Sequence, residues 1–70
     1  MKRRPVSSTT IAAVGYDERR KILEIEFTSG AVYRYSDVSR AVYAGLMSAD
    51  SHGLFFNLHV KGNYHHIRLE

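Results

Sequence analysis

Residues 23–35 constrain the fold of this chain most strongly, because they have the pattern of a β-hairpin. From Leu23 to Phe27, apolar residues alternate with two glutamates, which is the period of a half-buried strand. Gly30 follows where a hairpin turn often requires a positive φ, and a second alternating run comes after it. This stretch therefore predicts two antiparallel strands joined by a tight turn.

Two registers compete for this hairpin. A two-residue turn would place Ile25 beside Arg34. A three-residue loop with glycine in the left-handed conformation instead pairs Ile25 with Tyr33 and Glu24 with Arg34. Only the second register collects the apolar residues, with Tyr33 and Tyr35 among them, on one face of both strands. We therefore expect the second register.

The residues before the hairpin predict a further strand. Thr9 to Tyr16 alternates in the same way, and a four-residue loop, Glu18 to Lys21, would set Tyr16 opposite Leu23. The three strands then form an antiparallel meander, with the strand of residues 23–27 in the middle.

After Tyr35 the apolar period changes to three and four residues, which predicts helices. Ser39 is a suitable N-cap for a helix that runs to about Ala49. Asp50 or Ser51 could cap a second helix that runs to about Lys61. We expect an α+β fold, a three-stranded antiparallel meander followed by two helices on one face. The C-terminal tail is compatible with a short strand that buries Tyr64 and Ile67.

The net charge of +3 is concentrated at the N-terminus. Lys2, Arg3 and Arg4 supply it, because seven basic and seven acidic residues follow Pro5. We predict that residues 1–6 are a flexible basic arm. Such an arm can contact phosphates, or it can be a solvated tail.

The remaining residues predict a single domain over residues 7–68. Residues 69–70, Leu-Glu, resemble an expression-vector junction. The chain has no cysteine and no apolar run that could span a bilayer, and we expect a cytoplasmic protein without a membrane partner. So small a chain has little room for a substrate cavity, so catalysis is not expected, and no pattern indicates a cofactor.

Considered together, these features resemble the KTSC domain, which is named from a C-terminal region of some lysyl-tRNA synthetases. The matching residues are Ser7-Ser8, Val14-Gly15-Tyr16-Asp17, Leu23, Ile25, Phe27, Gly30, Tyr33-Arg34-Tyr35, Val38, Val42-Tyr43, Ala49, Ser51, Gly53, Phe55-Phe56-Asn57 and Val60. The family's central marker is a Tyr-x-Tyr pair, here Tyr33 and Tyr35. The resemblance covers roughly residues 6–64, and Ser39 departs from it where relatives tend to carry proline. It implies a link to RNA binding and no defined functional residues.

Among the family motif residues, the two tyrosines and the asparagine each have two interpretations. Tyr33 and Tyr35 could stack bases, or they could be core tyrosines below the helices, which the register favours. Ser51 and Gly53 fit the start of a helix, and Phe56 fits its buried face. Asn57 could face a ligand, but a hydrogen bond to backbone is the expected role. The family motif thus consists of Tyr33, Tyr35, Ser51, Gly53, Phe56 and Asn57.

The polar and charged clusters outside the motif give weaker signals. Arg19, Arg20 and Lys21 at a hairpin tip could contact phosphates together with the basic arm, although a solvated turn is the favoured interpretation of the loop alone. Asp50 and Ser51 beside a histidine invite a hydrolase interpretation, but neighbours on one helix rarely converge. The four histidines lack metal-ligand spacing, so no metal site is predicted. They are His52, His59, His65 and His66.

The sequence therefore predicts a small non-catalytic binding module. RNA is the preferred partner, with mainly electrostatic contacts through Lys2, Arg3, Arg4 and the hairpin tip. The alternative is a protein partner that adds a strand to an exposed sheet edge, at the first or third strand of the meander. An aromatic patch ringed by arginine and lysine would favour RNA, whereas a neutral apolar edge would favour a protein.

Overall fold

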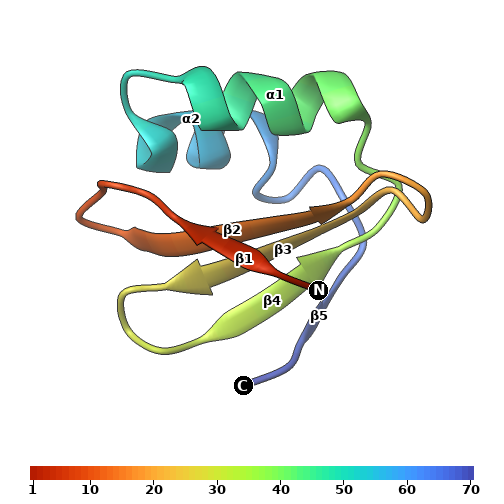
Figure 1. Ribbon diagram of the computed structural model, residues 1–70, viewed down its shortest axis with the longest axis horizontal. Helices are drawn as coiled ribbons and strands as arrows, with labels where there is room; N and C mark the ends of the chain where they lie inside the picture. The colour runs from red at the N-terminus through yellow and green to blue at the C-terminus, as the bar shows by residue number, and fades with distance from the viewer.

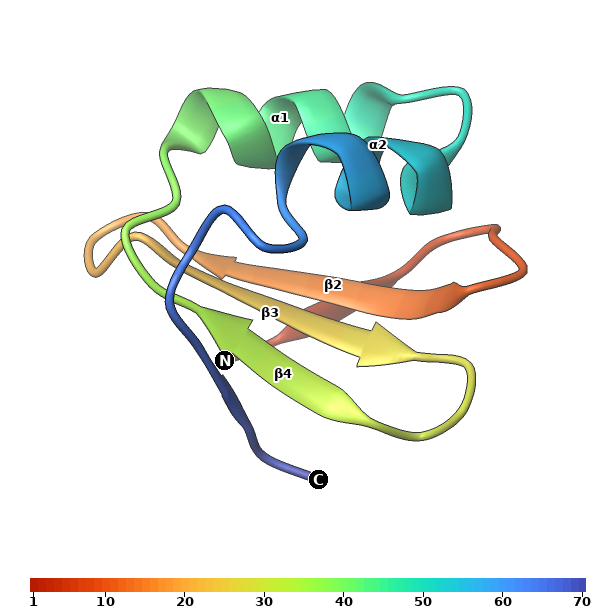
Figure 2. The same cartoon turned by 180° about the vertical axis from the view of Figure 1, so that it is seen from behind.

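The computed structural model describes residues 1–70 and contains one antiparallel sheet with two helices on the same side of it (Figures 1 and 2). The sheet has five strands, in the order β1-β2-β3-β4-β5, which is also the order of the chain. The elements are β1 (Arg3–Pro5), β2 (Ile11–Asp17), β3 (Ile22–Phe27), β4 (Val32–Tyr35), α1 (Arg40–Ser48), α2 (His52–His59) and β5 (His66–Arg68).

The hairpin of β3 and β4 has the predicted register. Ile25 pairs with Tyr33, and Glu24 pairs with Arg34. Gly30 has a φ of 97°, and its N–H donates to the Phe27 carbonyl at 2.9 Å. The left-handed glycine closes the three-residue loop, so both tyrosines of β4 lie on the side that the helices cover.

The predicted pairing of β2 with β3 is also confirmed, with Tyr16 opposite Leu23. A β-bulge interrupts the ladder between Ile11 and Ala13. Gly15 of β2 lies at a close backbone contact and not at the bulge, because a Cβ there would lie 3.0 Å from the Lys2 carbonyl oxygen. The glycine thus allows the backbone before β1 to approach β2 closely.

Serine caps begin both helices. The Ser39 hydroxyl accepts a hydrogen bond from the Val42 N–H at 3.3 Å, and the Ser51 hydroxyl accepts one from the Leu54 N–H at 3.1 Å. The second helix ends at His59, two residues before the predicted end at Lys61. The Val60 N–H still donates to the carbonyl four residues back, at Phe56, but the Lys61 N–H donates to the same carbonyl, five residues back, and the i→i−4 series ends there.

Close contact between the helices explains the glycine inside α1. A Cβ at Gly45 would lie 2.7 Å from the end of the Phe55 ring. Any larger side chain would push this ring away, so the packing of α1 on α2 offsets the low helix propensity of glycine. Neither helix has the length and the apolar run that a crossing of a membrane needs.

The structure has two strands more than the predicted meander. Residues 3–5 pair with β2 as β1, so this segment is not the free arm that the charge pattern indicated. Its pairing satisfies backbone groups on the edge of β2, and its first arginine forms two ion pairs with β3. At the other edge β5 pairs with β4, as the tail allowed, but Ile67 is 52% exposed and points away from the helices.

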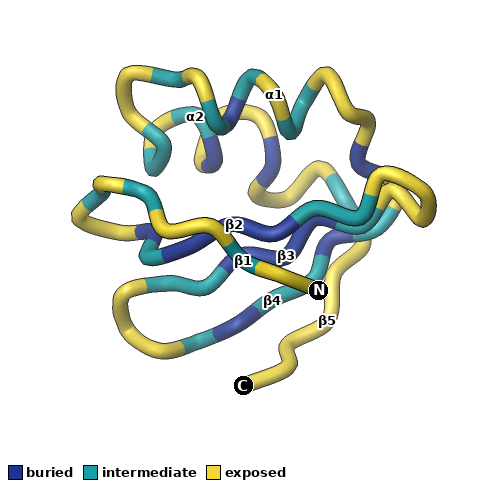
Figure 3. Tube along the Cα trace, in the orientation of Figure 1, coloured by how far each residue is buried: buried dark blue, intermediate teal, exposed yellow.

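The core lies between the helices and the central strands, where the buried segments gather in Figure 3. The fully buried side chains come from every layer. They are Ile11, Val14, Leu23, Ile25, Val38, Leu46 and Val60. Phe56 of α2 completes this core at 4% exposure, whereas Phe27 of β3 is only partly buried at one side of it.

The burial of Phe56 predicts the stability of a truncated variant. Phe56→Ala should lower the free energy of unfolding by about 3–5 kcal/mol, because it removes a large buried ring and leaves a cavity. Leu58→Ala on the same helix is the control, since Leu58 is 64% exposed and should change stability by no more than about 0.5 kcal/mol. Urea denaturation measures both variants, and equal losses would contradict the packing of α2 described here.

Candidate nucleic-acid interface

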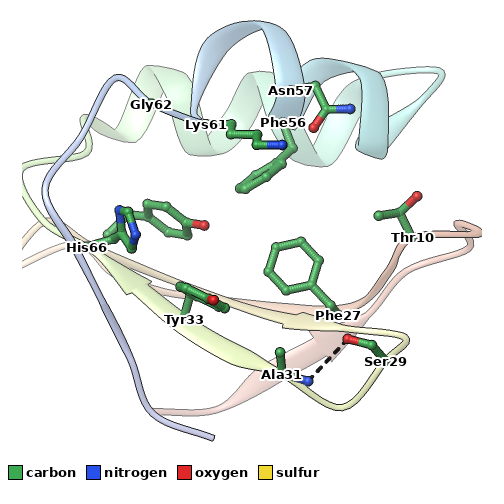
Figure 4. A pocket seen from close by; sticks show the side chains of 11 residues that line it. Thr10, Phe27, Ser29, Ala31, Tyr33, Phe56, Asn57, Lys61, Gly62 and His66 are labelled. Carbon is green, nitrogen blue, oxygen red and sulfur yellow. Dashed lines mark hydrogen bonds between the residues drawn. The ribbon is translucent and has the colours of Figure 1, made fainter.

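An open cleft of about 440 Å³ lies between α2 and the sheet (Figure 4). Asn57 and Phe56 come from α2, and Lys61 follows this helix in the chain. Phe27 of β3 and Tyr33 of β4 lie below them, with His66 of β5 at one end and Thr10 at the other (Figure 4). Tyr35, Ser29, Ala31 and Gly62 complete the lining. Its volume falls within the range of roughly 300–1,000 Å³ that small-ligand sites occupy.

Aromatic rings form most of the apolar surface of the cleft. The ring of Phe27 contacts Tyr33 edge-to-face with centroids 5.9 Å apart, and it contacts Phe56 in the same way at 5.3 Å. Tyr33 and Tyr35 are nearly parallel, with centroids 6.3 Å apart. Such contacts hold the rings against one another, so the shape of the cleft is largely formed without a ligand.

Strand register explains why these rings meet. Side chains two apart on a strand share a face, so Tyr33 and Tyr35 both point to the helices. His66 pairs with Tyr35 across the β4–β5 ladder, and Arg68 pairs with Tyr33. The Arg68 guanidinium carbon lies 5.8 Å from the centre of the Tyr33 ring, a distance at which a cation interacts with the ring face.

Two polar groups of the cleft have no hydrogen-bond partner within the chain. Tyr35 is 5% exposed, yet its hydroxyl makes no hydrogen bond to protein. No side-chain oxygen or nitrogen is both enclosed and unpaired, so this hydroxyl keeps accessible surface. The Asn57 amide is exposed and also unpaired. The hydrogen bond to backbone that was predicted for Asn57 is therefore wrong, and both groups are available to a ligand.

Burial raises the pKa of Tyr35. Loss of solvent around the phenol, with a smaller contribution from the neighbouring Tyr33, raises the pKa of Tyr35 to about 12. The hydroxyl is protonated at neutral pH, as an ordinary tyrosine is, and it can both donate and accept a hydrogen bond.

The structure divides the motif residues between the cleft and the helix start. Tyr33, Tyr35, Phe56 and Asn57 all line the cleft. Tyr35 belongs to the core as the register indicated, and Tyr33 is only partly buried. Ser51 caps α2, and its neighbour Gly53 packs against the Thr10 side chain, which a Cβ would approach to 3.3 Å.

Two of the six basic residues expected to contact phosphates, Arg3 and Arg20, form ion pairs within the chain. Arg3 lies 3.1 Å from Glu24 and 3.5 Å from Glu26, and Arg34 lies 2.7 Å from Glu24. Glu24 is 4% exposed between its two arginines, so its negative charge on the helix-free face of the sheet is compensated within the chain.

The structure does bring part of the N-terminal segment to the hairpin tip. Lys2, Arg20 and Arg34 line one hollow of about 390 Å³, but Asp17 and Glu18 line it as well. The guanidinium of Arg20 is 4.0 Å from the Asp17 carboxylate. Arg4, Arg19 and Lys21 are exposed outside this hollow. The predicted cluster is thus a mixed-charge surface, which attracts phosphates less than an all-basic one.

The histidines do not gather at a common point. The Nδ1 of His52 lies 2.8 Å from the Leu46 carbonyl oxygen, and His66 packs against the tyrosine pair. No group of three histidine, aspartate or glutamate side chains is placed to hold a metal ion.

Sequence reasoning missed several residues of the cleft. The alternation identifies Phe27 only as an apolar residue of its strand, and His66 appears only among the histidines without metal-ligand spacing. Thr10, Lys61 and Arg68 have no predicted role in a site. The alternation of His66 and Arg68 around an apolar residue was the one available signal, because it places both on the face that the tyrosines share.

The environment of Tyr35 predicts a late titration step. The pKa of Tyr35 in the folded state exceeds the ordinary value near 10, so the protonated phenol contributes fully to the stability of the fold below pH 10. This contribution is lost as the pH rises toward 12. Phenolate absorbance should show a step near pH 12 that Tyr35→Phe removes and Tyr43→Phe retains. Circular dichroism at each pH checks the fold, and an unchanged titration curve for Tyr35→Phe would contradict this environment.

Comparisons with known proteins agree on one family. The KTSC domain profile matches residues 7–64. A KTSC domain protein from Yersinia pestis has a crystal structure that superposes with a TM-score of 0.96 at 36% identity, covering 99% of this chain and 97% of that one. These matches confirm the resemblance found in the sequence.

Three further relatives show where such chains occur. An uncharacterized protein from Stutzerimonas stutzeri is 47% identical over 57 residues, which cover 81% of this chain and 80% of the relative. A protein from Tsukamurella paurometabola is 42% identical over 65 residues, covering 93% and 97%. A lysine–tRNA ligase from Nostoc punctiforme is 38% identical over 56 residues, which are 80% of this chain and 10% of the enzyme. The chain belongs to the KTSC domain family.

Proposed function

We propose that this KTSC domain binds single-stranded RNA through the aromatic cleft. The observation that carries the proposal is the chemistry of the cleft lining. Aromatic rings form its floor, Lys61 lines it and Arg68 lies over the Tyr33 ring. The hydroxyl of the mostly buried Tyr35 faces it with accessible surface and without a protein partner. An aromatic patch with basic residues around it is the feature that favours RNA over a protein partner.

Recognition of single-stranded RNA uses both aromatic rings and polar or basic side chains. Unpaired bases stack on aromatic side chains and on arginine planes, and their edges form hydrogen bonds with nearby polar groups. Tyr33 offers a partly exposed ring that Arg68 already contacts. The Lys61 ammonium lies at the α2 side of the same opening, where a phosphate beside a bound base would come near it.

This proposal moves the main contacts away from the N-terminus. Arg3 is held by two glutamates, so Lys2 and Arg4 are the remaining cations of that segment without an ion pair. These two residues and the hairpin tip can still attract RNA over a distance and make binding depend on salt. The cleft supplies the contacts that persist when salt screens such attraction.

The similarity to a lysine–tRNA ligase supports the same class of partner. That enzyme is named for a reaction on tRNA, and it carries a segment that is 38% identical to most of this chain. A domain that contacts RNA would be useful both within such an enzyme and as a separate small protein. The matching segment of the ligase supports only the class of ligand, RNA, whatever the rest of the enzyme does.

The alternative, a protein strand added to a sheet edge, has less support. The first and third strands of the predicted meander are not edges, because β1 and β5 cover them. The actual edges have three residues each, and β1 contains two arginines and Pro5. Short strands with charges and proline protect an edge from pairing with another chain.

Binding without catalysis is part of the proposal. The serine and histidine that invited a hydrolase interpretation have separate structural contacts. The Ser51 hydroxyl caps α2, and the His52 ring contacts the Leu46 carbonyl. Neither contact arranges a base beside a nucleophile, which hydrolysis through this pair would need.

Removal of the stacking ring tests the proposed function. A fluorescein-labelled single-stranded RNA of about ten nucleotides is suitable, because sites on small domains span roughly 4–16 nucleotides. Tyr33→Ala should weaken binding at least about fivefold in fluorescence anisotropy, because stacking on one ring contributes roughly 1–3 kcal/mol and a tenfold change corresponds to about 1.4 kcal/mol.

Tyr43→Ala is the matched control, since Tyr43 is a partly buried tyrosine of α1 that stacks on Tyr16 outside the cleft. It loses the same ring and should keep the wild-type affinity once circular dichroism shows that it is folded. Equal affinity of both variants for RNA, or no binding of RNA by the wild type at low salt, would refute the proposal.

A further inference from the structure

We infer that the cleft receives one unpaired purine base, whose edge is recognised by Asn57 and Tyr35. This inference rests on the proposed function and narrows it from single-stranded RNA to a particular kind of nucleotide. The cleft must have room for a single base. Its lining must favour a base over a purely apolar group, and two fused rings over one.

The dimensions of the cleft favour a single base. The volume of about 440 Å³ suits one small ligand, and the walls are α2 on one side and the β3–β5 region of the sheet on the other (Figure 4). Because the rings of the floor contact one another, the floor cannot easily open to admit a longer stack of bases. Neighbouring nucleotides would therefore continue over the surface.

The polar groups favour a base over an apolar side chain. A purely apolar ligand would cover the Tyr35 hydroxyl and leave it without a hydrogen bond, and such burial of a polar group costs free energy. A base offers donors and acceptors along its edge. The Asn57 amide carries a donor and an acceptor side by side, and it can form two hydrogen bonds with the N6 and N7 positions of adenine. The neutral Tyr35 hydroxyl can donate or accept as the base requires.

The aromatic surface favours a purine over a pyrimidine. Four aromatic rings from three elements line the cleft, namely those of Phe27, Tyr33, Tyr35 and Phe56. Apolar stabilisation grows with the area removed from water, so two fused rings gain more contact with this lining than one ring does. Stacking strength is also the usual origin of base preference where recognition by hydrogen bonds is limited.

The first measurement compares RNA strands of equal length and charge. Labelled oligoadenylate and oligouridylate are titrated with the intact chain at one salt concentration. The wild type should bind oligoadenylate about tenfold more tightly, and this factor corresponds to about 1.4 kcal/mol. Equal affinity for both strands would overturn the inference while leaving the proposed function in place, whereas no binding of either strand would refute the proposed function itself.

Paired variants connect this preference to the cleft. Asn57→Asp removes the amide donor and should reduce the ratio of the two affinities to about threefold or less, since a bidentate contact discriminates by roughly 1–3 kcal/mol. Asn63→Asp adds the same charge at an exposed asparagine outside the cleft lining and should keep the tenfold ratio. Because both variants weaken RNA binding through charge, the ratio and not the affinity is the readout. An equal ratio in the two variants would overturn the role of Asn57.

Tyr35→Phe tests the second polar group without removing the ring that packs in the core. It should weaken binding of oligoadenylate about tenfold and leave binding of oligouridylate within about threefold, as loss of one hydrogen bond to the purine requires. An unchanged affinity for oligoadenylate would remove Tyr35 from the proposed site.

The same purine chemistry could come from a free nucleotide or from a strand of RNA. Titration with AMP distinguishes these sources, observed through the backbone amide signals of the cleft residues. RNA as the source predicts that AMP shifts the same signals but binds at least about tenfold more weakly than oligoadenylate, because only the strand carries phosphates for Lys61 and neighbouring cations. AMP binding as tight as that of the strand would overturn the assignment to RNA.

Discussion

The left-handed glycine that closes the β3–β4 hairpin determines the side of the sheet on which the tyrosine pair lies. Gly30, with a φ of 97°, fixes a three-residue loop and so places Tyr33 opposite Ile25. A slip of one residue would exchange the two faces of the strand and turn both tyrosines away from the helices. The core would lose Tyr35, and the cleft would lose its stacking ring. Fold and candidate site therefore depend on the same turn.

A second interaction separates the two faces of the sheet electrostatically. Glu24 is buried on the helix-free face, where Arg3 of β1 and Arg34 of β4 both pair with it. A buried carboxylate needs such partners, because an uncompensated charge is costly to remove from water. The pairing links three strands and occupies Arg3, one of the residues predicted to contact phosphates. The proposed RNA site therefore depends on the cations at the cleft, on the opposite face.

Sequence reasoning succeeded where one local rule decides the structure. Alternation and turn chemistry sufficed for the central hairpin, and serine caps sufficed for the starts of both helices. It failed for β1 and most of β5, because three-residue edge strands have too few residues for a period and form only through pairing with a neighbour. The motif residues were found, but the cleft was not. It depends on how α2 sits above β4, and only the assembled fold brings Asn57 near Tyr33.

The central claim is that RNA binds in the aromatic cleft, and residue-by-residue NMR tests it most directly. A single-stranded RNA containing purines is added to the labelled chain while the amide and aromatic side-chain signals are followed. The account predicts that the largest shifts occur at Phe27, Tyr33, Phe56, Asn57 and His66, which line the cleft on four different elements. Shifts confined to β1 and the hairpin tip at residues 18–21, with the cleft signals unchanged, would contradict it.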